Sequence, residues 1–389
     1  MIAPPDRPLD VFLVAGEPSG DQLGFKLMRA LRAATGGAVR FRGVGGPAMT
    51  EEGLASLFPM ADIAVMGFIP VIKKLPQLIR RIRETADAAI AEPPDLLIIV
   101  DSPDFTHRVA RRVRAARPQV PIVDYVSPTV WAWRPGRAPR MRAYVDLLLA
   151  LLPFEPAAHE RLGGPRCVYV GHPLIERLDE LRPDEAEAAA RAATPPTLLV
   201  LPGSRRSEIE RLMDDFGAAV AELARRLGPL DVVLPAVAHL EPLIRARAAA
   251  WPVAPRIVLG EEAKFAAFRR ARAALAASGT VTLELALAQV PMTVAYRVSP
   301  VETLARFLVT APSIVLPNLI LGENAIPELL QEACTPAALA DATAPLLEGG
   351  AARDAQLAAL RRLDGLMALN DGEGPSARAA RLALELVGR

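Results

Sequence analysis

Short apolar runs that end in loops of glycine, serine, aspartate or proline recur along this chain, and helix-like stretches follow most of them. The runs do not alternate apolar with polar residues, which is typical of parallel strands covered on both faces. In the first half they are Asp10–Ala15, Val39–Val44, Asp95–Val100, Val120–Val126, Asp146–Leu152 and Arg166–Val170, and in the second half Thr197–Leu201, Asp231–Leu234, Arg256–Leu259, Ala273–Ala277 and Met292–Ala295. The pattern predicts an α/β fold with one Rossmann-like unit in each half.

A charged, alanine-rich stretch separates the two halves and reaches to Pro196. We place the linker there. We expect a first unit over residues 1–175, a second over 190–350 and C-terminal helices over 351–389.

Composition excludes several classes of protein. The net charge of +1 argues against a nucleic-acid partner held by bulk charge. Cys167 and Cys334 stand in unrelated contexts without metal-ligand spacing, as in a reducing compartment. No run is long enough to span a membrane, and Met1–Pro8 lacks the regions of a signal peptide. We therefore expect a cytoplasmic protein, free or attached peripherally to a membrane.

Two strand-to-helix turns in the second half are suited to a nucleotide diphosphate. Leu198–Ile209 carries Gly203, Ser204 and Arg205 between a strand and a helix, and Ala277–Glu284 carries Ser278, Gly279 and Thr280 in the same position. Helix-start amides and an arginine would bind the pyrophosphate, and Glu284 would bind ribose hydroxyls. The alternative is a pair of ordinary turns of an α/β sheet.

Carboxylates follow two strands of the first half. Asp101 comes directly after Asp95–Val100 and is either a general base facing a ligand or a helix cap. Asp104 is interpreted as the cap of the next helix, and Asp21 as a cap of its own helix. Glu17, held between glycine and proline, is free to touch a polar ligand.

Gly43–Pro47 is rich in glycine but lacks the spacing and the following acidic residue of a dinucleotide fingerprint, which disfavours a hydride-transfer enzyme.

Ser127–Arg134 combines two tryptophans with arginine, and three further arginines follow by position 142. Aromatic rings beside arginines suit a sugar face plus a phosphate, and the alternative is a solvated basic helix with buried indoles. Asn318 is a polar group in an apolar setting that needs a partner.

Val65–Arg83 mixes apolar and basic residues. Such a stretch can lie on an anionic membrane surface, and the alternative is a core-facing amphipathic helix interrupted by Pro70 and Pro76.

These motifs, in this order, resemble those of the lipid-A-disaccharide synthases. The resemblance runs from Val11 to about Gln331. Its blocks are Ala15–Asp21, Gly43–Pro47, Val65–Phe68, Asp101–Phe105, Tyr125–Arg134, Pro153–Glu155, Val170–Pro173, Leu201–Arg205, Ala277–Thr280, Pro291–Met292, Tyr296–Arg297 and Leu316–Leu319. One departure is Pro70, where the family commonly has an acidic residue.

The resemblance implies a GT-B fold, in which two Rossmann-like parallel-sheet domains face each other across a cleft. It implies transfer of 2,3-diacylglucosamine from UDP to the 6-hydroxyl of 2,3-diacylglucosamine 1-phosphate, with inversion to a β-1,6 linkage. It also implies no metal and no cofactor. In GT-B proteins the last helix often returns to the first domain, and Ala377–Val387 is the candidate here.

The resemblance also implies roles for individual residues. The catalytic residues would be Asp101, as general base, and Glu17. The donor site would comprise Gly203, Ser204, Arg205, Ser278, Gly279, Thr280, Glu284 and Asn318. Apart from the resemblance, we assign the acceptor site to Gly16, Ser19, Ser127, Trp133 and Arg134, and we infer that Arg134 binds the acceptor phosphate. Met66 to Ile82 would contact acyl chains or the inner face of the inner membrane, and a homodimer is left open. The rival predictions are a UDP-N-acetylglucosamine 2-epimerase of the same fold and a membrane-associated, UDP-sugar-binding module without catalysis.

Overall fold

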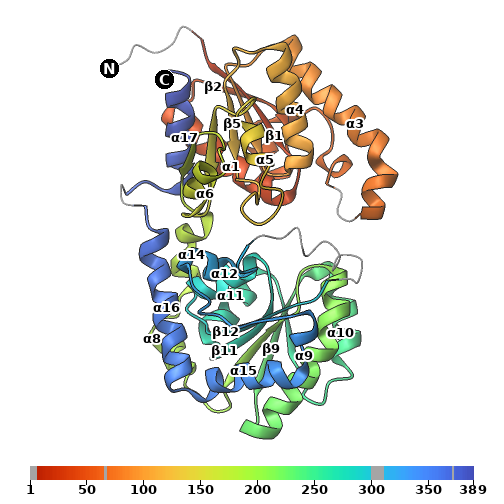
Figure 1. Ribbon diagram of the computed structural model, residues 1–389, viewed down its shortest axis with the longest axis vertical. Coiled ribbons are helices and arrows are strands. Elements are labelled where there is room, and N and C mark those ends of the chain that lie inside the picture. The colour runs from red at the N-terminus through yellow and green to blue at the C-terminus, as the bar shows by residue number, and fades with distance from the viewer. Residues whose placement is uncertain (1–6, 65–67, 299–310, 370–371) are drawn as a thin grey trace. The chain divides into compact units, whose positions relative to one another are not determined.

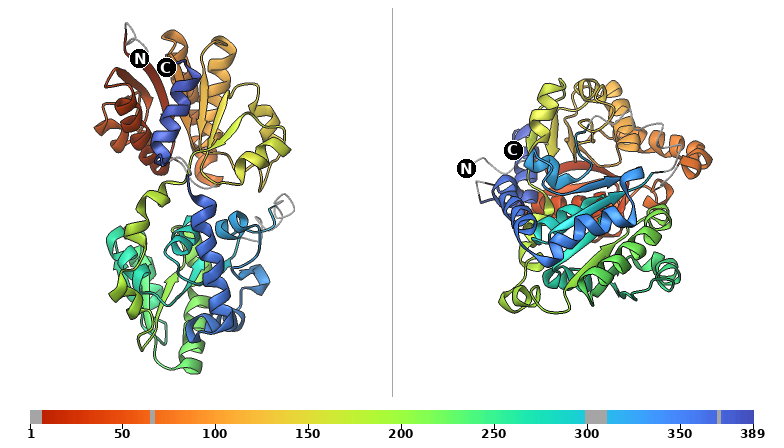
Figure 2. Two further views of the ribbon diagram at one scale, coloured as in Figure 1. Left: turned by 90° about the vertical axis from the view of Figure 1, so that its left-hand side faces the viewer. Right: turned by 60° about the horizontal axis from the view of Figure 1, so that its bottom comes forward.

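The computed structural model describes residues 7–64, 68–298, 311–369 and 372–389 and divides into two units. Unit 1 comprises Met1–Pro173 and Leu369–Arg389, and unit 2 comprises Leu174–Ala368. Each unit is a parallel sheet with helices on both faces (Figures 1 and 2).

The sheet of unit 1 has seven strands in the order β3-β2-β1-β4-β5-β6-β7, and every pairing is parallel. The strands are β1 (Leu9–Ala15), β2 (Val39–Val44), β3 (Ala55–Ser56), β4 (Leu96–Val100), β5 (Ile122–Tyr125), β6 (Leu147–Ala150) and β7 (Cys167–Tyr169). The helices are α1 (Pro18–Ala34), α2 (Pro47–Glu51), η1 (Met60–Asp62), α3 (Phe68–Ala91), α4 (Pro103–Ala116), α5 (Arg137–Met141), α6 (Glu155–Arg161) and α17 (Pro375–Leu386).

The two faces of this sheet belong to separate hydrophobic clusters, because successive side chains of a strand point to opposite faces. Val11 and Leu13 of β1 pack in one cluster with residues of α1 and α17. Phe12 and Val14 pack in the other, with residues of α3 and α4. The last helix of the chain, α17, thus covers the sheet of unit 1 (Figure 1).

The sheet of unit 2 has six parallel strands in the order β10-β9-β8-β11-β12-β13. Its strands are β8 (Thr197–Leu201), β9 (Asp231–Ala236), β10 (Arg256–Leu259), β11 (Ala273–Ala277), β12 (Met292–Tyr296) and β13 (Glu328–Leu330). Its helices are η2 (Pro173–Arg177), α7 (Leu178–Leu181), α8 (Glu185–Ala190), α9 (Arg206–Leu227), η3 (Ala238–Leu240), α10 (Glu241–Ala248), α11 (Glu261–Arg270), α12 (Thr280–Leu287), α14 (Leu316–Leu321), η5 (Gln331–Ala333), α15 (Pro336–Glu348) and α16 (Ala351–Met367).

The strand order reverses at one point in each sheet. In unit 1 the chain moves outward in opposite directions from the neighbours β1 and β4, and in unit 2 from β8 and β11. Open α/β sheets bind ligands at the carboxyl ends of the strands at such a point. The fold therefore directs attention to the loops after β1 and β4 and to those after β8 and β11.

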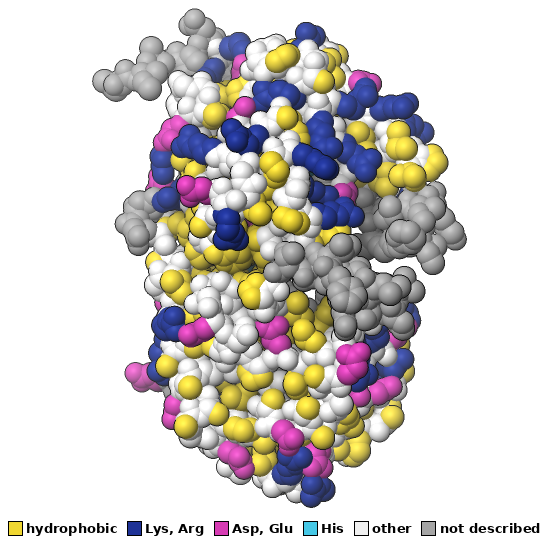
Figure 3. Space-filling model, viewed as in Figure 1, with side chains coloured by type: hydrophobic (Ala, Val, Ile, Leu, Met, Phe, Trp, Pro, Cys, Tyr) yellow, Lys and Arg dark blue, Asp and Glu magenta, His cyan; other side chains and the backbone are white. Residues whose placement is uncertain are grey.

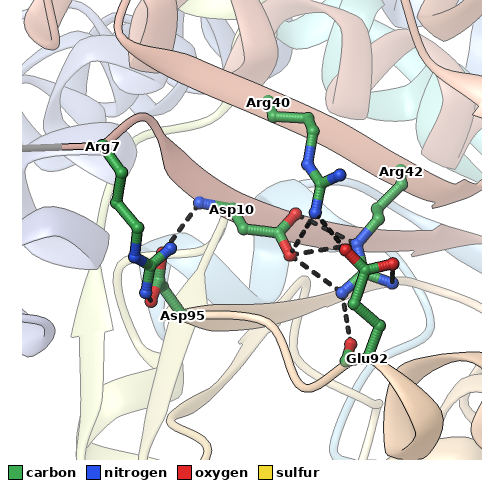
Figure 4. A network of polar contacts seen from close by, with 6 residues as sticks. All are labelled: Arg7, Asp10, Arg40, Arg42, Glu92 and Asp95. Atoms are coloured by element: carbon green, nitrogen blue, oxygen red, sulfur yellow. Dashed lines mark hydrogen bonds and ion pairs between the residues drawn. The ribbon is translucent and has the colours of Figure 1, made fainter.

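A charged network occupies the opposite edge of the unit 1 sheet, where the strands begin (Figure 4). Asp10 is 5% exposed. It accepts hydrogen bonds from Arg42 Nη2 at 2.8 Å and Arg40 Nη2 at 3.1 Å. Its backbone N–H donates to Asp95 at 2.9 Å, and Asp95 also binds Arg7 at 2.8 Å. The network lies away from the ligand-binding edge, so its role is to hold β1, β2 and the entry to β4 together.

We expect Arg42→Met to lower the free energy of unfolding by about 2 kcal/mol, because it leaves the buried Asp10 carboxylate short of charged donors. The matched variant is Arg40→Met. The Arg40 side chain is 55% exposed, so its replacement should lower the free energy of unfolding by less than about 1 kcal/mol. Urea unfolding of both variants measures the difference, and equal costs would contradict this account.

Candidate functional site

The loops after β1 and β4 lie side by side at the reversal point of unit 1, since Ala15 pairs with Val100 at the ends of these strands. A Cβ on Gly16 would come within 2.6 Å of the Cβ of Ser102, so this close approach requires glycine. The Ser19 hydroxyl donates to Asp101 Oδ2 at 3.4 Å. The structure thus brings together three of the predicted site residues of unit 1: Gly16, Ser19 and Asp101.

Asp101 has a constrained backbone and an available carboxylate oxygen. Its φ is 54° and that of Ser102 is 46°, both in the left-handed region that L-residues rarely adopt. The Asp101 N–H donates to Tyr125 O at 3.0 Å, and the Thr106 hydroxyl donates to Asp101 O at 2.7 Å. Oδ1 accepts from the Ser102 N–H at 2.7 Å, whereas among the described residues Oδ2 has only the long contact to Ser19. A half-buried carboxylate with one lightly engaged oxygen can accept a proton from a ligand.

The interpretation of Asp104 as a cap was wrong. The residue at the N-cap of α4 is Ser102, and Asp104 lies inside the first turn, where it pairs with Arg137 at 2.9 Å. The interpretation of Asp21 as a cap of its own helix was also wrong. Its buried carboxylate accepts from the N–H groups of Gly46, Ala48 and Met49, and therefore caps α2.

Glu17 stands at the N-cap position of α1, half-buried, and makes no side-chain cap hydrogen bond. Its carboxylate is thus not used in the local fold of the Gly16–Ser19 loop.

The Ser127–Arg134 loop has an internal part and an exposed part. Ser127 is buried, and its Oγ lies 2.8 Å from His159 Nε2 and 3.0 Å from Pro128 O. Trp133 is 37% exposed, and the guanidinium carbon of Arg134 lies 3.9 Å from the centre of its ring. Of the predicted acceptor residues in this loop, Trp133 and Arg134 are placed to meet a ligand, whereas Ser127 supports the loop from below.

Glu155 holds this loop and is expected to titrate near neutral pH. It is 3% exposed and accepts from Trp131 Nε1 at 3.2 Å and from the Leu152 N–H at 2.9 Å. Burial raises the pKa of Glu155 to about 7, against the lowering effect of these donors. Burial also lowers the pKa of His159 to about 4, so its imidazole is neutral at pH 7.

The folded protein therefore retains a proton on Glu155 between about pH 4.5 and 7 that the unfolded chain has lost. The stability contributed by this group falls as the pH rises through that window. We expect tryptophan fluorescence to titrate with a midpoint near pH 7, because the Trp131 hydrogen bond becomes charge-assisted. Trp131→Phe and Glu155→Gln should each abolish the transition, and a midpoint below about pH 5 would contradict the raised pKa.

Unit 2 contains a cavity of about 550 Å³ at its own reversal point. Its walls are the turns that follow β8, β9 and β11, together with the first turns of α9, α11 and α12. All the predicted donor residues except Asn318 line it, as do Glu208, Glu261 and Lys264. The size suits a nucleotide.

The turn after β8 does not offer its backbone amides, contrary to the expectation from the sequence. The N–H groups of Ser204 and Arg205 donate to Glu208 Oε2 at 3.0 and 3.1 Å, and Arg205 Nη1 binds Glu208 Oε1 at 3.0 Å. Gly203 has φ 113°, and a Cβ there would lie 2.3 Å from Glu208 Oε2. Sequence analysis missed Glu208. The glutamate at the third position of the helix, as in a capping box, was the signal.

The turn after β11 does offer amides. Gly279 precedes α12, and among the described residues the N–H groups of Gly279, Thr280 and Val281 have no hydrogen-bond partner. The Ser278 hydroxyl donates to Ile314 O at 2.7 Å and is thus engaged. The helix start is a site where an anion can bind.

A cation that sequence analysis missed lies beside this helix start. Lys264 Nζ contacts Glu284 Oε1 and Oε2 at 3.0 and 2.9 Å, and both side chains line the cavity. Nothing in the sequence pairs them, because Lys264 comes from α11 and Glu284 from α12. Together with Arg205, the lysine gives the cavity two cations.

Asn318 lies inside α14, not in a loop, and is 2% exposed. Its amide exchanges hydrogen bonds with the backbone of Ile326 at 2.9 and 3.0 Å and donates to Glu328 at 2.8 Å. Its partners are therefore internal, and it does not line the cavity.

From Phe68 onward, the apolar and basic stretch forms the start of α3. Met66 lies outside the described residues. The helix continues through Pro76 instead of being interrupted there, and Ile82 packs in the core. Leu75 and Ile79 are 44% and 39% exposed, and Figure 3 shows hydrophobic side chains beside Lys and Arg side chains where α3 lies. The described part of the chain has no helix long and apolar enough to cross a membrane.

Comparison with known proteins shows the family. The family model described as Lipid-A-disaccharide synthetase matches residues 11–371. The Lipid-A-disaccharide synthase of Nitrobacter hamburgensis is 58% identical over 376 residues, which cover 96% of this chain and 95% of that protein.

Solved structures with low sequence identity share the fold. The calicheamicin glycosyltransferase CalG4 is 19% identical, with a TM-score of 0.60 over 99% of both chains. The UDP-GlcNAc 2-epimerase from Neisseria meningitidis is 12% identical, with a TM-score of 0.57 over 97% of this chain and 98% of that one. The fold is thus GT-B, built from two Rossmann-like parallel-sheet units. By sequence, the chain belongs to the lipid-A-disaccharide synthase family and is a glycosyltransferase of lipid A biosynthesis.

Proposed function

We propose that the protein transfers 2,3-diacylglucosamine from UDP to the 6-hydroxyl of 2,3-diacylglucosamine 1-phosphate. The products are UDP and the β-1,6-linked disaccharide 1-phosphate. The observation that carries this proposal is Asp101, a half-buried carboxylate at the strand reversal of unit 1 whose Oδ2 is only lightly engaged. One such base is sufficient for a single displacement with inversion.

In this reaction Asp101 accepts the proton of the 6-hydroxyl as its oxygen attacks the anomeric carbon of the donor sugar. The bond from that carbon to the UDP oxygen breaks, and UDP leaves with the electron pair. Glu17, whose carboxylate makes no cap hydrogen bond in the neighbouring loop, would bind an acceptor hydroxyl. The constrained backbone of Asp101 keeps the base in place without a cost at the moment of reaction.

The cavity of unit 2 would hold UDP. The free amides at the start of α12, with Lys264 and Arg205, would neutralise the diphosphate. Glu284, oriented by Lys264, would accept hydrogen bonds from the ribose hydroxyls. The Neisseria epimerase structure, which has the same fold, is described as bound to UDP-GlcNAc.

The start of α3 would contact the inner face of the inner membrane, where both lipid substrates would be reached. Leu75 and Ile79 would enter the interface, and the exposed Lys74, Arg80 and Arg83 would meet anionic headgroups.

The test is the release of UDP in detergent, followed with a coupled assay in the presence and absence of the acceptor. A transferase releases UDP only when the acceptor is added. A 2-epimerase would act on the donor alone, and a binding module would bind UDP without any turnover, so either result would refute the proposal.

A further inference from the structure

Unit 1 also contains a cavity, of about 670 Å³, and five of its lining residues are arginines. Arg108 and Arg111 come from α4, and Arg134, Arg137 and Arg140 come from α5 and the segment before it. Asp104 is the single carboxylate residue in the lining. Figure 3 shows Lys and Arg side chains gathered over this part of unit 1.

The local fold explains how two distant segments form this wall. Asp104, Arg108 and Arg111 recur at helical spacing and therefore share one face of α4. Arg137 binds Asp104 at 2.9 Å and so ties the start of α5 to that face. This ion pair therefore links the two segments that line the cavity.

Most of the positive charge in the cavity is not neutralised. Among the arginines that line the cavity, only Arg137 has an ion pair within the described part of the chain, and its partner is Asp104. Arg111 lies over the ring of Tyr144, 4.9 Å from its centre, and Arg134 lies over Trp133. Arg108 and Arg140 are exposed and have no carboxylate partner in the described ranges. Guanidinium groups that line one cavity repel one another, and an anion bound between them would offset this repulsion.

The floor of the cavity is buried and ordered. His107 is 2% exposed; its Nδ1 lies 3.0 Å from the Tyr144 hydroxyl and its Nε2 3.0 Å from Asp124 Oδ2. These two contacts hold His107 of α4 in the protein interior, whereas Arg108 on the same helix is exposed and lines the cavity.

We propose that this arginine cavity binds the phosphate monoester of the acceptor sugar, an inference that rests on the proposed function. Guanidinium groups match phosphate oxygens in bidentate pairs, and a dianion offsets the excess positive charge. Pro103 and Asp104, which line the cavity, follow Asp101 in the chain by two and three residues. A sugar anchored here by its 1-phosphate has its other hydroxyls within the same loop region as the general base. The cavity thereby selects a phosphorylated acceptor.

The kinetic test uses the double variant Arg108→Gln/Arg140→Gln. Both side chains are exposed, so the fold should not change. The matched control is Arg112→Gln/Arg142→Gln, which removes the same charge from the same two segments but outside the cavity lining. We expect the KM for diacylglucosamine 1-phosphate to rise about 10- to 100-fold in the first variant alone. With an acceptor that lacks the 1-phosphate, the variant and the wild type should be equally poor, and a further loss in the variant would overturn the proposal.

A direct binding test does not depend on turnover. Phenylglyoxal modifies exposed arginines, and mass spectrometry reports the rate at each position. Glucosamine 1-phosphate should slow modification of Arg108 and Arg140 but not of Arg112 and Arg142. Protection by vesicles containing phosphatidylglycerol, without protection by the sugar phosphate, would overturn the proposal in favour of a lipid headgroup. If the sugar phosphate protects but no disaccharide is ever formed, the cavity assignment stands and the proposed reaction fails.

Discussion

Asp101→Asn is expected to lower kcat by about two to three orders of magnitude, the usual scale for a lost general base. Asparagine suits the position structurally, because it tolerates the left-handed backbone found there and its Oδ1 can still accept from the Ser102 N–H. The substitution therefore removes the basic oxygen and leaves the loop in place. Single-turnover rates in detergent measure the effect.

Two controls accompany this variant. The melting temperature should match that of the wild type, and UDP should bind with unchanged affinity, since the cavity proposed to hold the nucleotide belongs to unit 2. Asp87→Asn, at an exposed carboxylate paired with Arg112, should retain full activity. Near-normal turnover in Asp101→Asn would remove Asp101 from the role of base.

Gly43→Ala is expected to lower the free energy of unfolding by at least about 4 kcal/mol. Gly43 lies in β2 with φ 134°, directly opposite Leu13 of β1. A Cβ there would stand 1.9 Å from the Leu13 carbonyl oxygen, which is backbone and cannot turn aside. The methyl group must push apart β1 and β2, which are neighbouring strands of the sheet. This cost is a large part of the stability of a typical domain, so unit 1 should fail to fold or melt far below the wild type.

The matched variant is Gly163→Ala. That glycine also has a positive φ, 68°, but apart from its chain neighbours no atom of the described residues lies within 4 Å of a Cβ built on it. Gly163→Ala should lower the free energy of unfolding by about 1–2 kcal/mol, because only the strain of the left-handed backbone is added. Calorimetry of the two variants separates strain from steric overlap, and similar melting temperatures would contradict the close approach of β1 and β2.

The sequence predicted the sheets well because parallel strands covered on both faces consist of continuous apolar runs. Val39–Val44, Thr197–Leu201, Arg256–Leu259 and Ala273–Ala277 were predicted with the bounds that the structure has. The edge strands β3 and β13 were missed, since they have two and three residues and no apolar run. Helix propensity predicted an interruption at Pro76, but α3 continues through it. The later turns of α3 pack on the core, and this packing outweighs the loss of the backbone hydrogen bond that proline cannot donate.

The sequence could place the site loops but not their hydrogen-bond partners. Loops after strands are visible in a sequence, so Asp101, Gly203 and Gly279 could be assigned to the ligand-binding edges. The pairing of the Ser204 and Arg205 amides with Glu208, and of Lys264 with Glu284, depends on side-chain conformation and on contacts between separate helices. The arginine cavity could be predicted only in part. Arg134 was predicted to meet a phosphate, but Arg108 and Arg111 of α4 come to the same cavity through the tertiary fold, which the sequence does not show. The site roles themselves stay predictions until the variants are measured.

The most direct test is the structure of the product. UDP-2,3-diacylglucosamine carrying ¹³C in its sugar is mixed with unlabelled diacylglucosamine 1-phosphate and the protein in detergent, with and without EDTA, and the product is examined by mass spectrometry and NMR. We expect a disaccharide 1-phosphate that carries the label only in the non-phosphorylated sugar, has a β-1,6 linkage and forms equally under both conditions. A labelled monosaccharide with altered configuration at C2, or no disaccharide although UDP binds, would contradict the proposed reaction.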